Sequence, residues 1–211
     1  MRTASETSPD LELRRATCMT SQALDNFIAA STGLALANPD PAECVTAIAP
    51  LMHGLLAHAG SFLEPQHLRA NPDHYARNPI YVSHDQSLSL YAIVWTPGQW
   101  TPIHDHGSWG VVGVLQGVLE ERSYIRAGGH DASVRSADTD IELQRGGVIL
   151  IGSGSVTSFV PNPDHIHVTG VSADRPQVVS LHLYGRNMDS FHLYDLASRS
   201  RRRVRVEHNE S

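Results

Sequence analysis

The stretch PGQWTPIHDH spans residues 97–106 and places two histidines, His104 and His106, two positions apart. The surrounding residues predict β-structure, in which alternate side chains point to the same face of a strand. We therefore expect both imidazole rings on one face. A second histidine segment, PDHIHV at residues 163–168, follows farther along the chain. Together the two segments predict a mononuclear metal centre inside a β-barrel.

Short β-rich runs follow one another from Tyr81 onward, separated by glycine, proline and aspartate. Many short strands with turn residues between them are typical of a sandwich or a barrel. We expect a mainly β protein in which a small β-barrel occupies residues 80–196. The predicted strands cover residues 87–96, 110–116, 118–125, 147–151, 165–171 and 178–184.

The segment 11–75 is rich in alanine and has apolar residues three and four positions apart. This spacing predicts α-helices, and Asp40 before Pro41 predicts a helix N-cap followed by proline at the first helical position. Residues 1–10 are polar and lack the apolar middle of a signal peptide, so we expect a disordered leader. Arginines are frequent in residues 197–211, which we interpret as a solvated terminus.

Composition limits the classes of function. With 211 residues the chain is long enough for one well-buried domain. A net charge of -6, with no basic cluster outside the C-terminal arginines, argues against a nucleic-acid-binding protein. No long apolar run predicts a membrane span, and the two cysteines, Cys18 and Cys44, indicate no disulfide framework, so we expect a cytoplasmic protein. Lysine is absent, which excludes a Schiff-base lysine.

The third histidine of the metal centre is open between His165 and His167, because both are expected on the same strand face. Ser180, His182 and Tyr184 also alternate on one face of a predicted strand, so we expect a relay from hydroxyl to imidazole to phenol. The alternative is an ordinary strand with buried polar residues. Three such groups on one face, however, need mutual partners to avoid the cost of desolvation.

Taken in order, the His-x-His pair, the later His167 and the run SLHLY at residues 180–184 resemble the cysteine dioxygenase family of thiol dioxygenases, members of the cupin superfamily. The resemblance covers residues 75–184. It implies a double-stranded β-helix with helices packed at its N-terminal side, and a ferrous ion, Fe(2+), held by three histidines and no carboxylate. By motif, the implied ligands are His104, His106 and His167.

The family spacing to Ser180 favours His167 over His165 as the third ligand. Ordinary cupins add a glutamate ligand shortly after the His-x-His pair, whereas the stretch here is GSWGV at residues 107–111. Three neutral ligands leave three octahedral positions of iron free for a substrate that chelates through thiolate and amine, and for dioxygen. The implied role of the relay is to orient the Tyr184 hydroxyl toward the bound substrate or oxygen.

The segment YARN at residues 75–78 resembles the family segment in which an arginine binds the substrate carboxylate, so Arg77 is the implied substrate-binding residue. The alternatives are a surface arginine at this junction between helix and strand, or a carboxylate bound by Arg186. Related enzymes that act on 3-mercaptopropionate carry glutamine here, so Arg77 favours cysteine. Animal members carry a cysteine, thioether-linked to the relay tyrosine, where Gly110 stands, so Tyr184 is expected to be an unmodified phenol.

The resemblance thus implies an iron-dependent thiol dioxygenase that converts a small thiol carboxylate, L-cysteine before others, to its sulfinate with O2. One alternative is the same chemistry on 3-mercaptopropionate or another mercapto-acid, and another is a non-catalytic cupin that binds a metal or a small ligand. The expected partners are a small thiol and O2, with no nucleic acid and no membrane. We expect a monomer or a weak homo-oligomer, with Trp95 in the barrel core.

Overall fold

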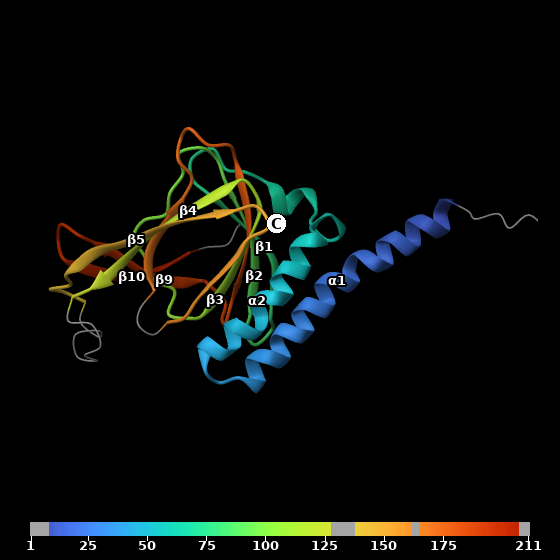
Figure 1. Cartoon of the computed structure of the whole chain (residues 1–211), viewed down its shortest axis with the longest axis horizontal. Coiled ribbons are helices and arrows are strands. Elements are labelled where there is room, and N and C mark those ends of the chain that lie inside the picture. The colour runs from blue at the N-terminus through green and yellow to red at the C-terminus, as the bar shows by residue number, and fades with distance from the viewer. Residues whose placement is uncertain (1–8, 128–137, 162–164, 207–211) are drawn as a thin grey trace, which may run out of the picture.

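The computed structural model describes the backbone of residues 9–127, 138–161 and 165–206, and side chains from residue 22 onward (Figure 1). Two helices come first, α1 (Pro9–Ala37) and α2 (Pro41–Ala57), and two short 3-10 helices follow, η1 (Ala59–Ser61) and η2 (Pro65–Leu68). The remaining elements are strands: β1 (Ala76–Val82), β2 (Ser89–Trp95), β3 (Gly110–Gln116), β4 (Val118–Arg126), β5 (Leu143–Gly152), β6 (Val156–Phe159), β7 (Ile166–Gly170), β8 (Val178–Tyr184), β9 (Ser190–Asp195) and β10 (Ser200–Arg205).

The strands form two antiparallel sheets and a C-terminal hairpin. Five strands pair in the order β1-β2-β8-β3-β6, three pair in the order β5-β4-β7, and β9 pairs with β10. Side chains of both sheets line one cavity, which therefore lies between them. The predicted mainly β fold, a double-stranded β-helix with N-terminal helices packed against it, is confirmed.

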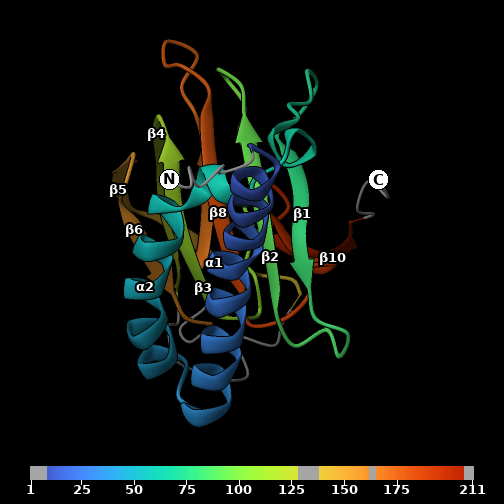
Figure 2. The same cartoon turned by 90° about the vertical axis from the view of Figure 1, so that its right-hand side faces the viewer.

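Both long helices lie on the outer face of the five-stranded sheet (Figure 2). Helix α2 approaches this sheet closely at Gly113 in β3, where an added Cβ would lie only 2.9 Å from Met52 Cγ. A glycine is needed here because any larger side chain would push the helix away from the sheet. The helix begins as predicted, with Asp40 as N-cap and Pro41 as the first helical residue.

Strand β2 is buried on both faces, because helices cover one side and the barrel interior the other. All seven of its residues are buried. Leu90 and Ala92 belong to the core under the helices, whereas Tyr91, Ile93 and Trp95 belong to the core inside the barrel. The prediction that Trp95 packs in the barrel core is thus confirmed. Strand β8 alternates in the same way, so every second side chain of the central sheet points into the barrel.

The structure differs from the sequence prediction in several segments. His104 and His106 lie outside the named strands, in a segment that joins β-structure only through isolated bridges of His104 with His167 and Leu193. The predicted strands also omit β1, β6, β9 and β10. Residues 200–205 of the arginine-rich terminus form β10, a strand that was not predicted from the sequence, and Arg202, Arg203 and Arg205 within it are exposed. A disordered leader was expected at residues 1–10. Residues 1–8 lie outside the described part of the chain, and residues 9 and 10 form the beginning of α1.

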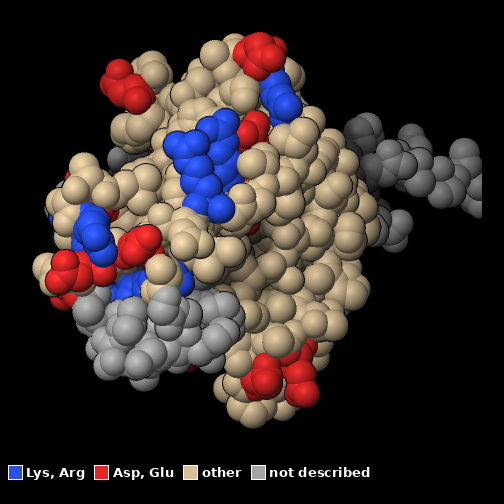
Figure 3. Space-filling model, turned by 60° about the vertical axis from the view of Figure 1, so that its left-hand side comes forward, with Lys and Arg blue, Asp and Glu red and all other residues tan. Residues whose placement is uncertain are grey.

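The described surface carries charged side chains of both signs. The face drawn in Figure 3 shows arginines and acidic residues in small groups, several of them side by side, with broad uncharged regions between the groups. No helix in the described part of the chain is long and apolar enough to cross a membrane.

The N-cap of α2 gives a stability prediction. Asp40 Oδ1 accepts hydrogen bonds from the backbone N–H groups of Ala42 at 2.7 Å and Glu43 at 3.4 Å. We predict that Asp40→Ala lowers the free energy of unfolding by about 1 kcal/mol, because two helix N–H groups lose their acceptor. Urea denaturation measures this change. The control is Asp25→Ala at an exposed position inside α1, which should cause no loss; equal losses in both variants would contradict the capping role.

Candidate metal centre

A cavity of about 520 Å³, measured with its opening to solvent, lies inside the barrel. It is lined by polar and apolar side chains from both sheets and from the segment that precedes β3. The lining includes the three histidines of the implied ligand set. It also includes two residues of the relay, His182 and Tyr184, and the implied substrate-binding residue Arg77.

His104, His106 and His167 converge at this cavity. One ring nitrogen from each lies within 4.8 Å of the others, and all three residues are buried. The ring centroids of His104 and His106 are 4.8 Å apart, and those of His104 and His167 are 4.6 Å apart. The structure thus brings together the three histidines that the motif singled out, although the first two lie in a bridged segment rather than in a strand.

The protonation of two of these rings follows from their neighbours. His104 Nδ1 lies 3.0 Å from the carbonyl oxygen of Pro102, and a carbonyl only accepts, so the N–H is on Nδ1 and Nε2 carries a lone pair. His167 Nδ1 lies 3.1 Å from Glu121 Oε2, which fixes the same tautomer. Burial lowers the pKa of His104, His106 and His167, and neighbouring imidazoles add to the effect. All three rings are therefore neutral.

The unpaired nitrogens of these rings fit a bound cation. His167 Nε2 and His106 Nδ1 are buried and have no hydrogen-bond partner among the described residues. Leaving buried polar atoms unpaired is costly, and native proteins do so chiefly where a water, an ion or a ligand belongs. Neutral imidazoles are common ligands of first-row transition metals. The residues present therefore fit a divalent transition-metal ion.

Glu121 of β4 lies behind His167. Burial alone would raise the pKa of Glu121, but hydrogen bonds with His165 and His167 lower it below the usual range, so the carboxylate is ionised. A carboxylate that accepts the N–H of a metal-binding histidine fixes the ring and makes its other nitrogen more basic. Thr169 Oγ1, at 3.2 Å from His167 Nδ1, adds a further polar contact.

A second group of potential ligands, Glu121, His165 and His167, shares one histidine with the first. In this group the side-chain atoms that could bind a metal already lie at hydrogen-bond distances from one another. His165 Nε2 is 3.2 Å from His167 Nδ1 and 3.4 Å from Glu121 Oε1. Because these contacts satisfy the second group internally, the unpaired nitrogens favour the site of His104, His106 and His167, with His165 outside it.

The side chains of Ser180, His182 and Tyr184 form the expected chain of contacts inside the barrel. Ser180 Oγ lies 2.9 Å from His182 Nε2, and His182 Nδ1 lies 3.1 Å from Tyr184 Oη. A fourth member, Trp95, donates its indole N–H to Ser180 Oγ at 3.0 Å. The three buried polar side chains of this strand therefore satisfy one another's hydrogen bonds, together with Trp95.

Trp95 also favours one direction for the hydrogen bonds of the relay. Its N–H can only donate, so Ser180 Oγ accepts it and has its own proton available for His182 Nε2. His182 Nδ1–H then donates to the Tyr184 oxygen, which leaves the phenol proton free to point into the cavity. Burial lowers the pKa of His182 to about 3 and raises the pKa of Tyr184 above its usual range. The relay therefore consists of a neutral imidazole and a protonated phenol.

Arg77 is the second residue of β1, and its side chain lines the cavity rather than the outer surface of the protein. One terminal nitrogen, Nη2, donates to the carbonyl of Met188 at 2.8 Å, and the guanidinium lies 4.9 Å from the ring centroid of Tyr91. The other terminal nitrogen, Nη1, is buried with no partner among the described residues. Arg186, the alternative, likewise donates to a carbonyl, that of Ser190, and has a buried Nε without a partner among the described residues, but it is not among the residues that line this cavity. The structure thus gives Arg77 a free donor for an acidic ligand group.

Gly110 lies directly across from Tyr184 in the pairing of β3 with β8, and across from Phe159 in the pairing of β3 with β6. A Cβ added at Gly110 would lie 2.3 Å from Phe159 Cζ. The phenylalanine ring thus fills the space that a side chain at Gly110 would occupy beside the tyrosine. The same ring lies 4.5 Å, between centroids, from His106 and from His165.

Sequence reasoning missed three contributors to the site: Glu121, Phe159 and the indole N–H of Trp95. Alternation along β4 could have found Glu121, because it shares a face with the buried Leu119. No local signal pointed to Phe159, since β6 has only four residues and depends on its pairing with β3.

A double-stranded β-helix with histidines around an internal cavity defines the class of the protein as a cupin. A family model described as cysteine dioxygenase type I matches residues 66–197. The chain belongs to the cysteine dioxygenase type I family. Membership points to a dioxygenase-type enzyme of the cupin superfamily.

Similar solved structures include a cupin-like protein from Thermotoga maritima, with 15% identity over 55% of this chain and 74% of that chain and a TM-score of 0.37. A conserved protein with a double-stranded β-helix domain from Klebsiella pneumoniae shows 15% identity over 60% of this chain and 84% of that chain, with a TM-score of 0.41. An RmlC-like cupin from Ralstonia eutropha shows 12% identity over 65% and 72%, with a TM-score of 0.42.

The arrangement of the two ligand groups gives a prediction about metal retention. We expect His167→Ala to lose the metal, because a facial site of three ligands does not survive the loss of one. His165→Ala should still bind one metal ion per chain, since His165 contacts the ligand but is outside the site. Metal analysis after gel filtration of the reconstituted proteins measures both. Loss of the metal by both variants would place it in the second group, because His167 belongs to both groups and His165 only to the second.

Proposed function

We propose that the protein is an iron(II)-dependent thiol dioxygenase that converts L-cysteine and O2 to cysteine sulfinate. The observation that carries this proposal is the convergence, in one cavity, of three neutral histidines, a guanidinium nitrogen without a partner on Arg77, and the phenol of Tyr184. These groups suit a metal, a carboxylate and a proton-donating contact respectively. The reaction needs no further reductant, because the thiol sulfur is oxidised by four electrons and takes both atoms of O2.

The metal would be held by His104, His106 and His167. A ferrous ion bound there would supply the redox chemistry that activates dioxygen and would accept a thiolate as a further ligand. Glu121 would keep the His167 ring in place through its Nδ1–H, and Pro102 would do the same for His104. The three rings need no deprotonation to bind metal at neutral pH, since burial already keeps them neutral.

Arg77 would orient the substrate by binding its carboxylate. The guanidinium already has one nitrogen fixed by Met188, so its geometry is set before substrate arrives, and Nη1 is available for a charge-assisted hydrogen bond. Tyr184, held by His182 through the relay, would direct its O–H toward the substrate or the developing sulfinate oxygen. Both side chains line the cavity that holds the three histidines.

We choose L-cysteine over 3-mercaptopropionate because the chain carries arginine, not glutamine, at position 77. The identity of the thiol is the most specific statement in this proposal. A non-catalytic cupin would have no use for a phenol aimed at the cavity by three buried partners. We further propose that the enzyme acts in the cytoplasm on free small thiols, as a monomer or a weak homo-oligomer.

An oxygen-electrode survey of the iron-loaded enzyme tests this function. We expect rapid oxygen uptake with cysteine, slower uptake with 3-mercaptopropionate and mercaptosuccinate, and very slow uptake with cysteamine, which lacks a carboxylate. One O2 should be consumed for each cysteine sulfinate formed. Preferred oxidation of 3-mercaptopropionate would overturn the substrate, and absence of thiol-dependent uptake by iron-loaded protein would overturn the reaction.

Removal of Arg77 tests the carboxylate contact. We predict that Arg77→Ala lowers kcat/KM for cysteine by a factor that corresponds to about 2–4 kcal/mol, because the buried carboxylate loses its charged partner. The rate with cysteamine should hardly change. Arg186→Ala is the matched control and should leave kcat/KM for cysteine near the wild-type value. The reverse pattern in the two arginine variants would place the carboxylate on the other side of the cavity.

Removal of the phenol oxygen tests the relay. We predict that Tyr184→Phe retains iron and binds cysteine but turns over at least about tenfold more slowly, equivalent to about 1.4 kcal/mol in the transition state. Single-turnover rates and metal content measure the two effects separately. Wild-type turnover in this variant would show that the relay only maintains packing.

A further inference from the structure

The segment that carries His104 and His106 is held between two strands that come later in the sequence. On one side, His104 exchanges backbone hydrogen bonds of 3.0 Å with His167 of β7. On the other side, Asp105 N–H donates to the carbonyl of His192 at 3.2 Å, and Tyr194 N–H donates to the carbonyl of Ile103 at 2.9 Å. The ligand-bearing segment therefore depends on β9 for half of its backbone pairing.

The side chain of Asp105, which lies between the two histidines in the sequence, is also bound by β9. Its carboxylate accepts the backbone N–H of His192 at 3.1 Å, the Nδ1–H of the same residue at 3.1 Å, and the Tyr194 hydroxyl at 2.8 Å. Asp105 is buried, and so is Tyr194. A buried carboxylate with three donors from one strand is fixed in position relative to that strand.

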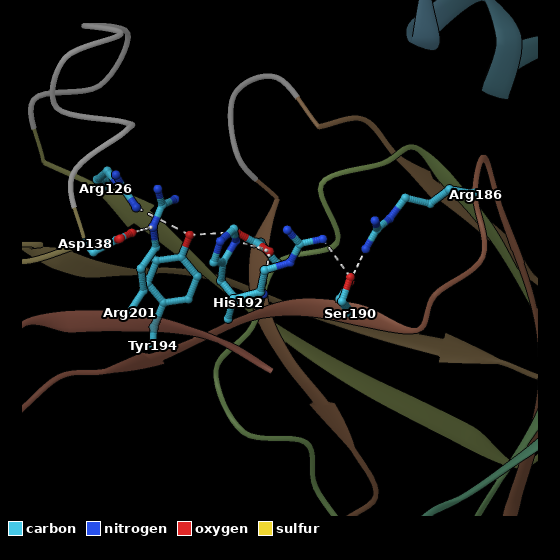
Figure 4. A network of polar contacts seen from close by, with 9 residues as sticks. Arg126, Asp138, Arg186, Ser190, His192, Tyr194 and Arg201 are labelled. Atoms are coloured by element: carbon cyan, nitrogen blue, oxygen red, sulfur yellow. Dashed lines mark hydrogen bonds and ion pairs between the residues drawn. The ribbon is translucent and has the colours of Figure 1, made fainter. Parts of the chain in front are cut away.

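Strand β10 holds β9 in place in turn. In its pairing with β9, Arg201 lies across from Tyr194 and Arg203 lies across from His192. Arg201 Nε donates to Asp138 at 2.8 Å, and the Arg201 N–H donates to the carbonyl of Asp138 at 2.9 Å. Figure 4 shows this group of side chains, with Arg126 donating to the Tyr194 hydroxyl at 3.4 Å. Tyr194, which donates to Asp105, is thus placed by its backbone pairing opposite Arg201 of β10 and by the contact of its hydroxyl with Arg126 of β4.

We propose that the hairpin β9–β10 positions the segment that carries His104 and His106, with Asp105 and Tyr194 as its positioning residues. The hairpin would thereby set how tightly the metal is bound, although none of its residues belongs to either potential ligand group. Strand β10 lies beyond residue 197, where the family match ends. The inference rests on the proposed function only in taking the three histidines as metal ligands.

Cobalt(II) titration of the metal-free full-length protein tests this proposal, with the visible ligand-field bands as the readout of coordination geometry. Tyr194→Phe removes the hydroxyl donor to Asp105 and keeps the ring. We expect it to weaken cobalt binding by roughly ten- to a hundredfold, the usual range for partners of metal ligands, and to shift the bands. Asp105→Asn should act in the same direction. The unfolding temperature of each metal-free variant is measured in parallel.

The matched control is Tyr124→Phe. Tyr124 packs against the same hydrophobic cluster as Tyr194, but the hydroxyl that donates to Asp105 is that of Tyr194. It should bind cobalt like the wild type. Wild-type affinity and bands in both Tyr194→Phe and Asp105→Asn would overturn the proposal, as would a lower unfolding temperature with unchanged cobalt affinity. Because the readout is metal binding, a wild-type protein that binds cobalt but, with iron, oxidises no thiol would contradict only the proposed function.

Discussion

Three neutral imidazoles buried around one cavity are the constraint on which the rest of the site depends. One buried nitrogen of His106 and one of His167 have no hydrogen-bond partner among the described residues, and the desolvation of such atoms is costly unless something else binds them. A protonated ring would supply a donor, but burial and the neighbouring imidazoles lower the pKa of each histidine. A divalent cation resolves this conflict without adding a proton, so the cluster is built for a metal.

The surrounding fold can be understood as the means of keeping these rings in place. Helices cover the outer face of the central sheet, so its inner face is free to carry polar chemistry into the barrel. One row of inward side chains on β8 gives the relay, and Arg77 on β1 at the edge of the same sheet adds a cation. The three-stranded sheet supplies His167 together with the carboxylate of Glu121. Each sheet thus contributes a different part of the site.

The sequence was most informative where function depends on close spacing along the chain. The spacing of two positions from His104 to His106, and again from Ser180 to His182 and from His182 to Tyr184, was enough to predict which side chains would share a face. Contacts between segments that are distant along the chain could not be predicted from such local spacing. The bond of Asp105 to Tyr194 and the place of Phe159 opposite Gly110 depend on strand pairings that no local pattern encodes. Strand β10 was not predicted because charged side chains are typical of solvated ends, whereas the pairing of β10 with β9 uses the backbone.

X-ray absorption at the iron edge, recorded on the iron-loaded enzyme before and after anaerobic addition of cysteine, tests the central claim most directly. The account predicts multiple scattering from imidazole ligands in the resting enzyme and a new sulfur scatterer bound to iron once cysteine is present. Iron without imidazole scattering, or iron that acquires no sulfur neighbour with saturating cysteine, would contradict it.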